Sequence, residues 1–595
     1  MKTFPAISIL IFSLISFNAQ SLPTDRLTDW SGAGASLEIP DRDSLNIRTM
    51  GAKGDSATVN DSILDQAIDS LADQNGGTIY MPPGDYLFES RIDLKEGVWL
   101  AGQGSYKTQL IFDAPGQDLI RIHGSPKQAG TEITQPANRG GEFILAKDPG
   151  VFEEDEPIEI KQDGEPVMER EWAYDHYGQI VQAEGLEGDT IYIDPPLRIN
   201  LEDSLNPRIN KVDWITDSGV SCLGIFRTNE TEGQTSNISF RYAHDARVNA
   251  VASEKCNFSH VELSQSANIT VENSFFRDAF DHGGGGNAYG VTTHLIATDN
   301  LVENNIFQEL RHSMLLQAGA NGNVFVGNFS DNPIADDPPL PEDFTGDIVL
   351  HGNYPHHNLF EHNVVQTFSV DGYHGINGPN NTFFRNQAER YGLYTSNDPP
   401  TDSQIYIGNH IPADQGQFLL NGEGHWLQAN HFRDSLIPES TELPDAAGLF
   451  YADGPPEFWH DDFPWPSIPH QESPSAFTNP AQQRYEEGEY TVCEARQEPE
   501  TSLNPNRKTG QRFQASFHPV PFREQFTINF KQSLNKEIMI TLHSLNGKQK
   551  FETSERVNNN EVTITPKDIN PGVYVVQVLD VDGNTDNLGK ILKIE

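Results

Sequence analysis

One short phrase, repeated along the middle of the chain, decides the fold. It reads Asn300-Leu-Val-Glu-Asn-Asn305, Asn323-Val-Phe-Val-Gly-Asn328 and Asn358-Leu-Phe-Glu-His-Asn363, with looser or similar copies at residues 268–273, 381–386, 404–409 and 425–430. Each copy is long enough for a strand and too short for a helix. The closing Asn recurs at steps of 32, 23, 35, 23, 23 and 21 residues. This self-similarity predicts a solenoid whose repeat is a coil of strands and turns.

The closing Asn residues are explained by turn chemistry. Asn tolerates the left-handed backbone conformation and can hydrogen-bond its own backbone, so it suits a sharp bend at the end of a strand. On stacked coils, successive Asn side chains can also bond to each other in a ladder. We therefore expect a structural role for them and no catalytic one. The steps of 32 and 35 residues predict coils with inserted loops, which is where binding sites gather.

Composition bounds the function. The 595 residues suffice for more than one domain, and 86 Asp and Glu against 40 Lys and Arg give a net charge of −46. Such a charge argues against nucleic acid or an anionic membrane as the main partner. A local cluster of His and Arg can still bind an acidic substrate.

The chain has three cysteines, Cys222, Cys256 and Cys493. They are too few for a disulfide framework or a Cys-rich metal site. Cys222 and Cys256 can reach each other on neighbouring coils, but we expect buried free thiols.

Residues 1–21 have the pattern of a signal peptide, with Lys2, an apolar run over residues 6–17 and the small Ala19. The run is too short to span a membrane, and no later segment offers a transmembrane helix. We therefore expect an exported mature protein.

The N-terminal region carries a first family resemblance. Met50-Gly-Ala-Lys-Gly-Asp55 and Gly76-Gly-Thr-Ile-Tyr-Met-Pro-Pro-Gly-Asp-Tyr86 flank a stretch with apolar residues at helical spacing. A helix here would cover the open end of a solenoid. Residues 46 to about 113 resemble the N-terminal cap and first coil of the pectate-lyase-like right-handed β-helix superfamily, and the repeats to about residue 430 follow it more loosely.

This resemblance implies an all-β fold, a right-handed parallel β-helix with an N-terminal helical cap, over residues 22–497. Between residues 141 and 210 the spacing breaks down, and alternating runs such as Ile158-Glu-Ile-Lys161 predict a β-rich insertion. After residue 430 a stretch rich in Pro and aromatic residues excludes regular helix or central strand, and we expect it to wrap along the solenoid or close its C-terminal end. The superfamily includes lyases, glycoside hydrolases, epimerases and phage tailspikes, so the likeness implies a fold and not a reaction.

The C-terminal region carries a second resemblance. Residues 498–514 are a polar linker, and residues 515–595 contain short strands and the hairpin turn Asn546-Gly547. Phe517-His-Pro-Val-Pro-Phe522, Pro571-Gly-Val-Tyr574 and Lys590-Ile-Leu-Lys-Ile594 resemble the C-terminal sorting domain of type IX secretion cargo, known from Bacteroidetes. The resemblance implies a small β-sandwich-like domain, the type IX machinery as a partner, and a secreted or cell-surface protein. The alternative is a small carbohydrate-binding β-sandwich.

Chemistry-bearing residues recur at one register. Four successive coils carry a His with an Asp or Arg nearby at a similar distance after the closing Asn: Asp281 with His282, Arg311 with His312, Asp347 with His351, and Asp371 with His374. Rungs of a solenoid stack about 4.8 Å apart, so these groups can converge across a groove. Each His taken alone is explained as a core or turn residue, but a cluster of titratable groups indicates a site. His362 and His425 lie inside the phrase and are expected to be structural.

Two mechanisms fit these residues. In a lyase, His312, His351 or His374 would remove the proton next to a uronate carboxylate, with Arg311 neutralising the developing charge and Tyr354 as the acid. In a hydrolase, Asp371 and Asp347 would flank the glycosidic bond. The residues expected to bind substrate lie in the inserted loops and beside them: His282, Asp281, Tyr289, His356 and His357.

The chain departs from the superfamily's familiar patterns, because Gly372-Tyr-His-Gly375 is only a partial match to a polygalacturonase motif and no arginine-centred calcium signature is present. The cofactor therefore stays unknown, with calcium at the Asp residues as the candidate. We predict a secreted enzyme that cleaves an acidic polysaccharide by β-elimination. The alternatives are a glycoside hydrolase of the same fold and a non-catalytic glycan-binding or adhesion protein.

Overall fold

The structure, a computed structural model, divides into two compact units, residues 1–499 and 500–595. The first unit is described over residues 22–36, 44–127, 130–231, 233–336, 345–396, 398–439, 442, 444–460, 463–465 and 477–493. The second is described over residues 515–518, 523–530, 537–544, 549–557, 560–567, 569, 572–580 and 585–593. The expected signal peptide and the expected linker lie outside the described residues.

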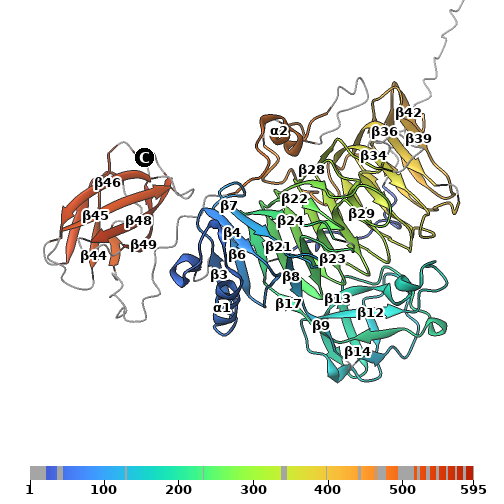
Figure 1. Cartoon of the computed structure of the whole chain (residues 1–595), viewed down its shortest axis with the longest axis horizontal. Helices are drawn as coiled ribbons and strands as arrows, with labels where there is room; N and C mark the ends of the chain where they lie inside the picture. Colours follow the sequence, from blue (N-terminus) through green and yellow to red (C-terminus); the bar gives the residue numbers. More distant parts are fainter. Residues whose placement is uncertain are drawn as a thin grey trace, which may run out of the picture. The chain divides into compact units, whose positions relative to one another are not determined.

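The first unit is a right-handed parallel β-helix, drawn from blue to yellow in Figure 1. Its first ladder is a parallel sheet of β1 (Ser44–Asn46), β3 (Gly77–Tyr80), β6 (Val98–Ala101), β18 (Gly219–Ser221), β21 (Ala243–Asn249), β24 (Ala267–Glu272), β27 (Leu301–Glu303), β30 (Val324–Val326), β33 (Leu359–Glu361), β35 (Thr382–Phe384), β37 (Ile405–Ile407) and β40 (Trp426–Gln428). β17 (Ile215–Thr216) also pairs with β21.

The second ladder runs through β2 (Asp55–Val59), β4 (Gly84–Phe88), β7 (Thr108–Phe112), β19 (Gly224–Arg227), β22 (Ala252–Cys256), β25 (Phe275–Ala279), β28 (Ile306–Gln308), β31 (Phe329–Asp331), β34 (Val364–Val370), β36 (Gln387–Thr395), β38 (His410–Ile411) and β41 (Asn430–Phe432), with β42 (Ser435–Ile437) antiparallel at its end. The third ladder runs through β5 (Ile92–Asp93), β8 (Ile120–His123), β20 (Ile238–Arg241), β23 (Ser259–Ser264), β26 (Tyr289–His294), β29 (His312–Leu316), β32 (Ile348–Leu350), the second halves of β34 and β36, and β39 (Gln417–Leu419). One continuous apolar core fills the coils.

The helical cap is present as α1 (Asp61–Ala72). Its Leu64, Ala67, Ile68 and Leu71 are buried and join the core of the first coils. Figure 1 shows α1 beside β3, at the blue end of the β-helix. The helix therefore covers apolar residues that an open end would expose.

Buried Asn side chains connect the coils in two ladders. Asn305, Asn328, Asn363, Asn386, Asn409 and Asn430 form one of them, in which each Nδ2 donates to the Oδ1 of the next Asn over 2.9–3.1 Å. The same Oδ1 accepts the backbone N–H of the preceding Asn, and the same Nδ2 also donates to a carbonyl of the coil before. Asn300, Asn323, Asn358 and Asn381 repeat the pattern at the opening position and end on Gln404. The predicted ladder is therefore observed, and it saturates the donors of each amide.

The left-handed bend falls one residue earlier than the phrase suggests. Asn304, His362, Arg385 and Ala429, each just before a ladder Asn, have φ between 48° and 54°. Asn273 has φ 57° itself, and the residue that bonds Asn305 is Ser274, so the first copy is shifted by one position. The turn residue redirects the chain, and the Asn that follows it points inward to join the ladder.

A β-sheet is inserted between the early coils. It contains β10 (Thr131–Glu132), β11 (Phe143–Leu145), β12 (Glu156–Gln162), β13 (Tyr177–Glu187), β14 (Thr190–Asp194) and β15 (Arg208–Asn210), all antiparallel, and has its own core. β9 (Ser125–Pro126) and β16 (Val212–Asp213) pair where the chain leaves and re-enters the β-helix. The insertion packs beside the coils around residues 294–320 and 354.

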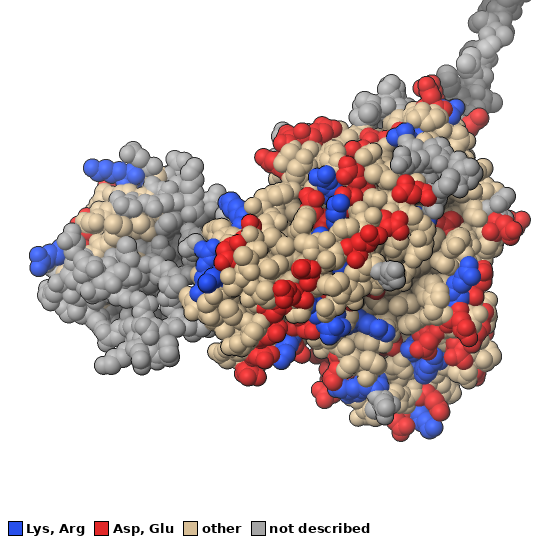
Figure 2. All heavy atoms as spheres, in the orientation of Figure 1, with Lys and Arg blue, Asp and Glu red and all other residues tan. Residues whose placement is uncertain are grey.

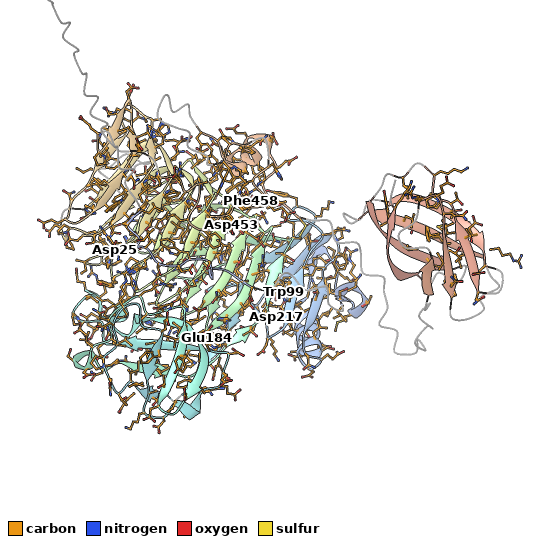
Figure 3. All side chains as sticks on the ribbon, turned by 180° about the vertical axis from the view of Figure 1, so that it is seen from behind. Asp25, Trp99, Glu184, Asp217, Asp453 and Phe458 are labelled. Carbon is orange, nitrogen blue, oxygen red and sulfur yellow. A yellow bond between two sulfur atoms is a disulfide. The ribbon has the colours of Figure 1, made fainter. Side chains whose placement is uncertain are left out.

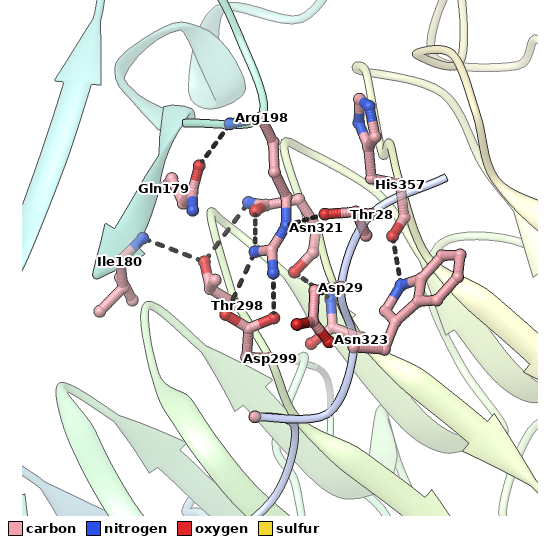
Figure 4. Close-up of polar contacts among 12 residues, drawn as sticks. Thr28, Asp29, Gln179, Ile180, Arg198, Thr298, Asp299, Asn321, Asn323 and His357 are labelled. Carbon is pink, nitrogen blue, oxygen red and sulfur yellow. Dashed lines mark hydrogen bonds and ion pairs between the residues drawn. The ribbon is translucent and has the colours of Figure 1, made fainter. Parts of the chain in front are cut away.

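Arg198 fixes the insertion to the β-helix (Figure 4). Its buried guanidinium pairs with Asp299 through both Nη atoms, at 2.5 and 3.1 Å, and also donates to Asn321 Oδ1. Its Nε lies 3.4 Å from Thr28 Oγ1 of the N-terminal segment. One side chain thus joins three parts of the chain, and its charge is compensated by Asp299, as burial requires.

Two straps, one from each end of the unit, lie along the coils. In the N-terminal strap, residues 22–36, Arg26 donates to Asn380, Ser403 and Gly424 on three successive coils. The C-terminal strap is the described part of residues 444–493. Two of its backbone N–H groups donate to Glu361 of the β-helix, and its Asn479 side chain donates to the Asn328 carbonyl. α2 (Pro480–Glu487) belongs to this strap. Figure 3 shows Asp453 and Phe458 over the middle strands of the β-helix.

A disulfide closes the C-terminal strap onto the early coils. Cys493 bonds Cys222, 271 residues away in sequence, and Cys256 is a buried free thiol. The expectation of a free Cys222 is therefore wrong, because the strap returns to the coil of β18 and β19. The spacing of the repeats does not predict this contact. Among the described residues, no helix is both long and apolar enough to cross a membrane.

The second unit is a pair of small antiparallel sheets around one core. One sheet contains β43 (Ala515–His518), β44 (Phe526–Phe530) and β47 (Glu561–Ile564), and the other contains β45 (Glu537–Ser544), β46 (Gln549–Arg556), β48 (Gly572–Asp580) and β49 (Thr585–Lys593).

Replacing Asn328 by Ala tests the ladder. The change removes two ladder partners and leaves the backbone N–H of Asn305 and the carbonyl of Val302 without their bonds. We expect the free energy of unfolding of the β-helix to fall by about 3 kcal/mol, the cost of leaving buried polar groups unpaired. Urea unfolding measures it. Asn138→Ala, at an exposed position in the insertion, is the control, and equal stability of the two variants would contradict the role of the ladder.

Candidate active site

A pocket of about 880 Å³ opens on the outer face of the third ladder. The register of the strands builds it. Four residues, each at the end of a paired strand or directly after it, form a column across four successive coils: His294, Gln317, His351 and Asp371. All four line the pocket. The glycine loop 284–286 and residues 345–346 contribute to one wall, and Trp172 of the insertion contributes to another.

His351 and Asp371 form the central pair. His351 Nδ1 lies 2.7 Å from Asp371 Oδ2, and both side chains are mostly buried. Burial alone would raise the pKa of the Asp371 carboxyl, but the His351 charge and hydrogen bond, with the N–H of Tyr373, hold it below its usual value. The pair therefore presents an imidazole that an ionised carboxylate orients.

His312 is held as a proton acceptor. Its Nδ1 lies 2.9 Å from the carbonyl oxygen of Gly346, which can only accept, so Nδ1 carries the hydrogen and Nε2 keeps its lone pair. Burial, the Arg311 charge and His351 lower the pKa of His312 to about 3. No described residue hydrogen-bonds Nε2, so this nitrogen is available to a ligand in the pocket.

His374 and Tyr373 lie on the other side of His351. The His351 ring stacks on the Tyr373 ring at 5.6 Å between centroids and meets the His374 ring edge-on at 4.8 Å. His374 Nδ1 accepts a hydrogen bond of 3.1 Å from Arg170 Nε of the insertion. Burial, His351 and Arg170 lower the pKa of His374 to about 4.

Arg311 and Tyr289 complete the set that the sequence places here. Tyr289 pairs with His312 across β26 and β29, and its ring lies 5.2 Å from the His312 ring. Arg311 Nη1 lies 3.4 Å from the Tyr289 hydroxyl, and both residues line the pocket. A guanidinium beside an imidazole with a free lone pair suits an anionic substrate.

The other predicted residues are not among those that line the pocket. Asp347 is fully buried and bonds Ser330 Oγ at 2.5 Å and the N–H groups of Gln366 and Thr367, where β34 passes between two ladders. Burial raises the pKa of Asp347 to about 7. Its position before β32 points it into the corner between ladders, so it cannot face Asp371 across a substrate.

Asn353 and Tyr354 both have positive φ and form a turn, which His356 and His357 follow. That turn directs them to the insertion and the N-terminal strap: Tyr354 packs on Tyr177, and the two buried histidines bond each other at 2.8 Å.

His282 and Asp281 make hydrogen bonds within the glycine loop and beside it. His282 Nε2 lies 2.9 Å from the Glu309 carbonyl. Asp281 accepts hydrogen bonds from Gly283 N and Asn287 Nδ2, so it shapes the loop whose glycines reach the pocket.

Sequence reasoning missed several residues that line the pocket, among them Trp172, His294, Gln317, Tyr373 and Tyr394. It also missed Arg170, which hydrogen-bonds the lining residue His374. His294 and Gln317 follow from the column register once the strands are aligned, and Tyr373 lies between two predicted residues. Arg170 and Trp172 come from the insertion, which has no repeat and gives no signal of its position. Trp172, Tyr373 and Tyr394 are 47%, 69% and 37% exposed, so the rim offers flat aromatic surfaces.

Calcium is the candidate cofactor that the sequence offers for this site. Among the described residues, no three His, Cys, Asp or Glu side chains are grouped so as to hold a metal ion. The calcium candidate therefore gains no donor set from Asp347, which is sealed away, or from Asp371, which is paired with His351. On the face of the β-helix that Figure 2 shows, Asp and Glu are scattered among uncharged residues, with Lys and Arg interspersed.

Comparison with known proteins confirms both resemblances. Residues 44–141 match the family described as rhamnogalacturonase A/epimerase, pectate lyase-like, and residues 516–592 match the secretion system C-terminal sorting domain. The sorting domain is the signal for type IX export, so the type IX machinery is a partner and the protein is delivered to the cell surface or beyond it.

Similarity to individual proteins is local in sequence. The chain is 32% identical over 89 residues to mannuronan C5-epimerase AlgE6 of Azotobacter vinelandii and 34% identical over 97 residues to AlgE4 of the same organism. These segments cover 14% and 15% of this chain, and the chain spans only 10% and 17% of those two proteins. A solved tailspike, gp54 of Acinetobacter baumannii bacteriophage AP22 in complex with capsular saccharide, aligns over 93% of this chain and 96% of its own with 12% identity and a TM-score of 0.38.

The state of His312 is directly measurable. With a pKa of about 3 in the folded protein, the ring stays neutral as the pH falls from 7 to 4. Since the unfolded chain takes up this proton near pH 6.5, the contribution of His312 to stability is present above pH 6.5 and is lost as the pH falls toward 3. Nitrogen-15 NMR of histidine-labelled protein, assigned with His312→Gln, should show a neutral ring protonated at Nδ1. Titration near pH 6, or a proton on Nε2, would contradict the geometry.

Proposed function

We propose that the protein is an enzyme that removes the proton from C5 of a uronate residue in an acidic polysaccharide and cleaves the chain by β-elimination. One observation carries the proposal: a single pocket joins a histidine with an available Nε2 lone pair, a His–Asp pair and an arginine. A base and a group that neutralises the substrate carboxylate are the two requirements for abstracting a proton next to a carboxylate.

The residues divide into roles by their hydrogen bonds. His312 Nε2 takes the C5 proton, because its Nδ1 is committed to Gly346. His351, oriented by Asp371, and Arg311 bind the uronate carboxylate and stabilise the charge that develops on it. The electron pair of the C5–H bond forms the C4–C5 double bond as the bond from C4 to the glycosidic oxygen breaks, and that oxygen takes up a proton. The exposed rings of Trp172, Tyr373 and Tyr394 suit stacking against sugar rings.

Hydrolysis by two carboxylates has less support. Among the described residues that line the pocket, Asp371 is the only carboxylate, and it is bonded to His351. Asp347, the other member of the expected pair, is bonded inside the corner of the coil. A hydrolase would need a general acid and a second carboxylate on either side of the scissile bond.

Epimerisation is the second candidate, and the local similarity to the two mannuronan C5-epimerases supports it. Removing the C5 proton is common to both reactions. In epimerisation a proton returns to C5 from the opposite face of the sugar, and the glycosidic bond survives.

A panel of uronate-containing polysaccharides, alginate and pectate among them, tests the proposal. With the full-length protein we expect ultraviolet absorbance from unsaturated uronates to rise together with new reducing ends. His312→Gln should lower the rate by about 10²–10⁴-fold, the usual contribution of a general base. His410→Gln is the matched control, since His410 is also buried but bonds Gln387 on the second ladder.

The other outcomes are also informative. Reducing ends without absorbance would favour hydrolysis. Exchange of the C5 hydrogen with deuterated water, without chain cleavage, would favour epimerisation. Binding without any of these changes would contradict the enzyme proposal and favour a glycan-binding protein.

A further inference from the structure

We propose that Arg170 of the insertion is a positioning residue that holds His374 in the tautomer protonated at Nε2, so that His374 donates a hydrogen bond in the pocket. The inference rests on the proposed function for the use of that hydrogen bond, namely stabilising the departing glycosidic oxygen while it takes up a proton from solvent. The hydrogen-bond geometry from which it starts is independent of any activity.

The direction of the Arg170–His374 bond fixes the tautomer. A guanidinium has N–H donors and no acceptor, so Arg170 Nε, 3.1 Å from His374 Nδ1, must be the donor. Nδ1 therefore carries a lone pair, and a neutral ring must then bear its hydrogen on Nε2. Arg170 Nη2 also donates to the Tyr373 carbonyl at 2.9 Å, so the guanidinium holds two consecutive residues of the loop after β34.

The segment that carries Arg170 is itself clamped to the β-helix. Asn353 Oδ1 accepts the backbone N–H groups of Glu169 and Arg170, at 3.0 and 3.1 Å, and Asn353 N donates to the His374 carbonyl. Two residues further on, the Trp172 ring meets the His374 ring edge-on at 5.8 Å. Arg170 and Trp172 of the insertion thus contact the His374 ring, and Asn353 of the β-helix holds its backbone, which together restrict how the ring can turn.

The result is two histidines of opposite tautomer in one pocket. His312, bonded to a carbonyl, offers a lone pair on Nε2, and His374, bonded to a guanidinium, offers a hydrogen on Nε2. His351 lies between them, with ring centroids 5.9 Å from His312 and 4.8 Å from His374. β-Elimination can use both groups, one that accepts the C5 proton and another that stabilises the negative charge on the leaving oxygen by a hydrogen bond.

The charges that face His374 keep it neutral. Burial and the positive charges of His351 and Arg170 lower its pKa to about 4, against a smaller opposite effect of Asp371. Because only the neutral imidazole has distinct tautomers, Arg170 can select one of them here.

Two substitutions of Arg170 separate positioning from mere packing. Arg170→Lys keeps a donor-only side chain, so His374 should remain protonated at Nε2. Arg170→Glu supplies an acceptor, so the hydrogen should move to Nδ1. Nitrogen-15 NMR of the histidine-labelled full-length protein at pH 7, assigned with His374→Gln, reads the tautomer in wild type and both variants. Wild type protonated at Nδ1, or a tautomer that is the same in Arg170→Glu and wild type, would overturn the inference whatever the activity.

Kinetics supply the second readout. We expect Arg170→Glu to lower kcat by about 10²-fold or more, the scale of one hydrogen bond to a developing negative charge, and Arg170→Lys to retain most of it. A rise in KM with unchanged kcat would show that Arg170 acts only through its charge on the substrate and would overturn the role of the His374 hydrogen bond in the reaction. If the tautomers are as expected but His312→Gln is fully active, the proposed function fails while the positioning by Arg170 stands.

Discussion

Each coil of this β-helix depends on buried amide groups that hydrogen-bond the coils on either side. A parallel coil has no hairpin to fix its register, and a shift of one residue would turn every outward side chain inward. The Asn ladders remove this freedom, because an amide can satisfy its two donors and its oxygen only when the neighbouring Asn stands directly above it. That register also aligns the column of side chains on the third ladder that lines the pocket.

The register explains why part of the site could be predicted. Counting from the closing Asn placed Arg311, His312, His351, Asp371 and His374 on one face, and all five line one pocket. The same count placed Asp347 with them, but side-chain direction alternates at a corner, and Asp347 bonds the N–H groups of β34. The copy at residues 268–273 shows the same limit, because the Asn that closes it takes the left-handed turn itself.

Contacts between distant segments could not be predicted in this way. The insertion has its own core and no repeat, so nothing in the sequence places Arg170 and Trp172 against His374, about 200 residues later in the chain. The Cys222–Cys493 bond was missed for the same reason, since the strap that carries Cys493 has neither period nor regular strands. The period of the repeats predicts which coils are neighbours along the stack. It does not predict where the insertion and the C-terminal strap contact those coils.

The disulfide also determines how the molecule tolerates being cut. It closes a covalent loop that contains nearly all the coils from Cys222 onward and the whole C-terminal strap. Closing so long a loop restricts the unfolded chain by on the order of 5 kcal/mol in the chain-entropy view. The chain that joins the β-helix to the sorting domain begins after Cys493, outside this loop. A protease that severs the chain there therefore frees no end from which the coils can unravel, and the β-helix keeps its strap when the export signal is gone.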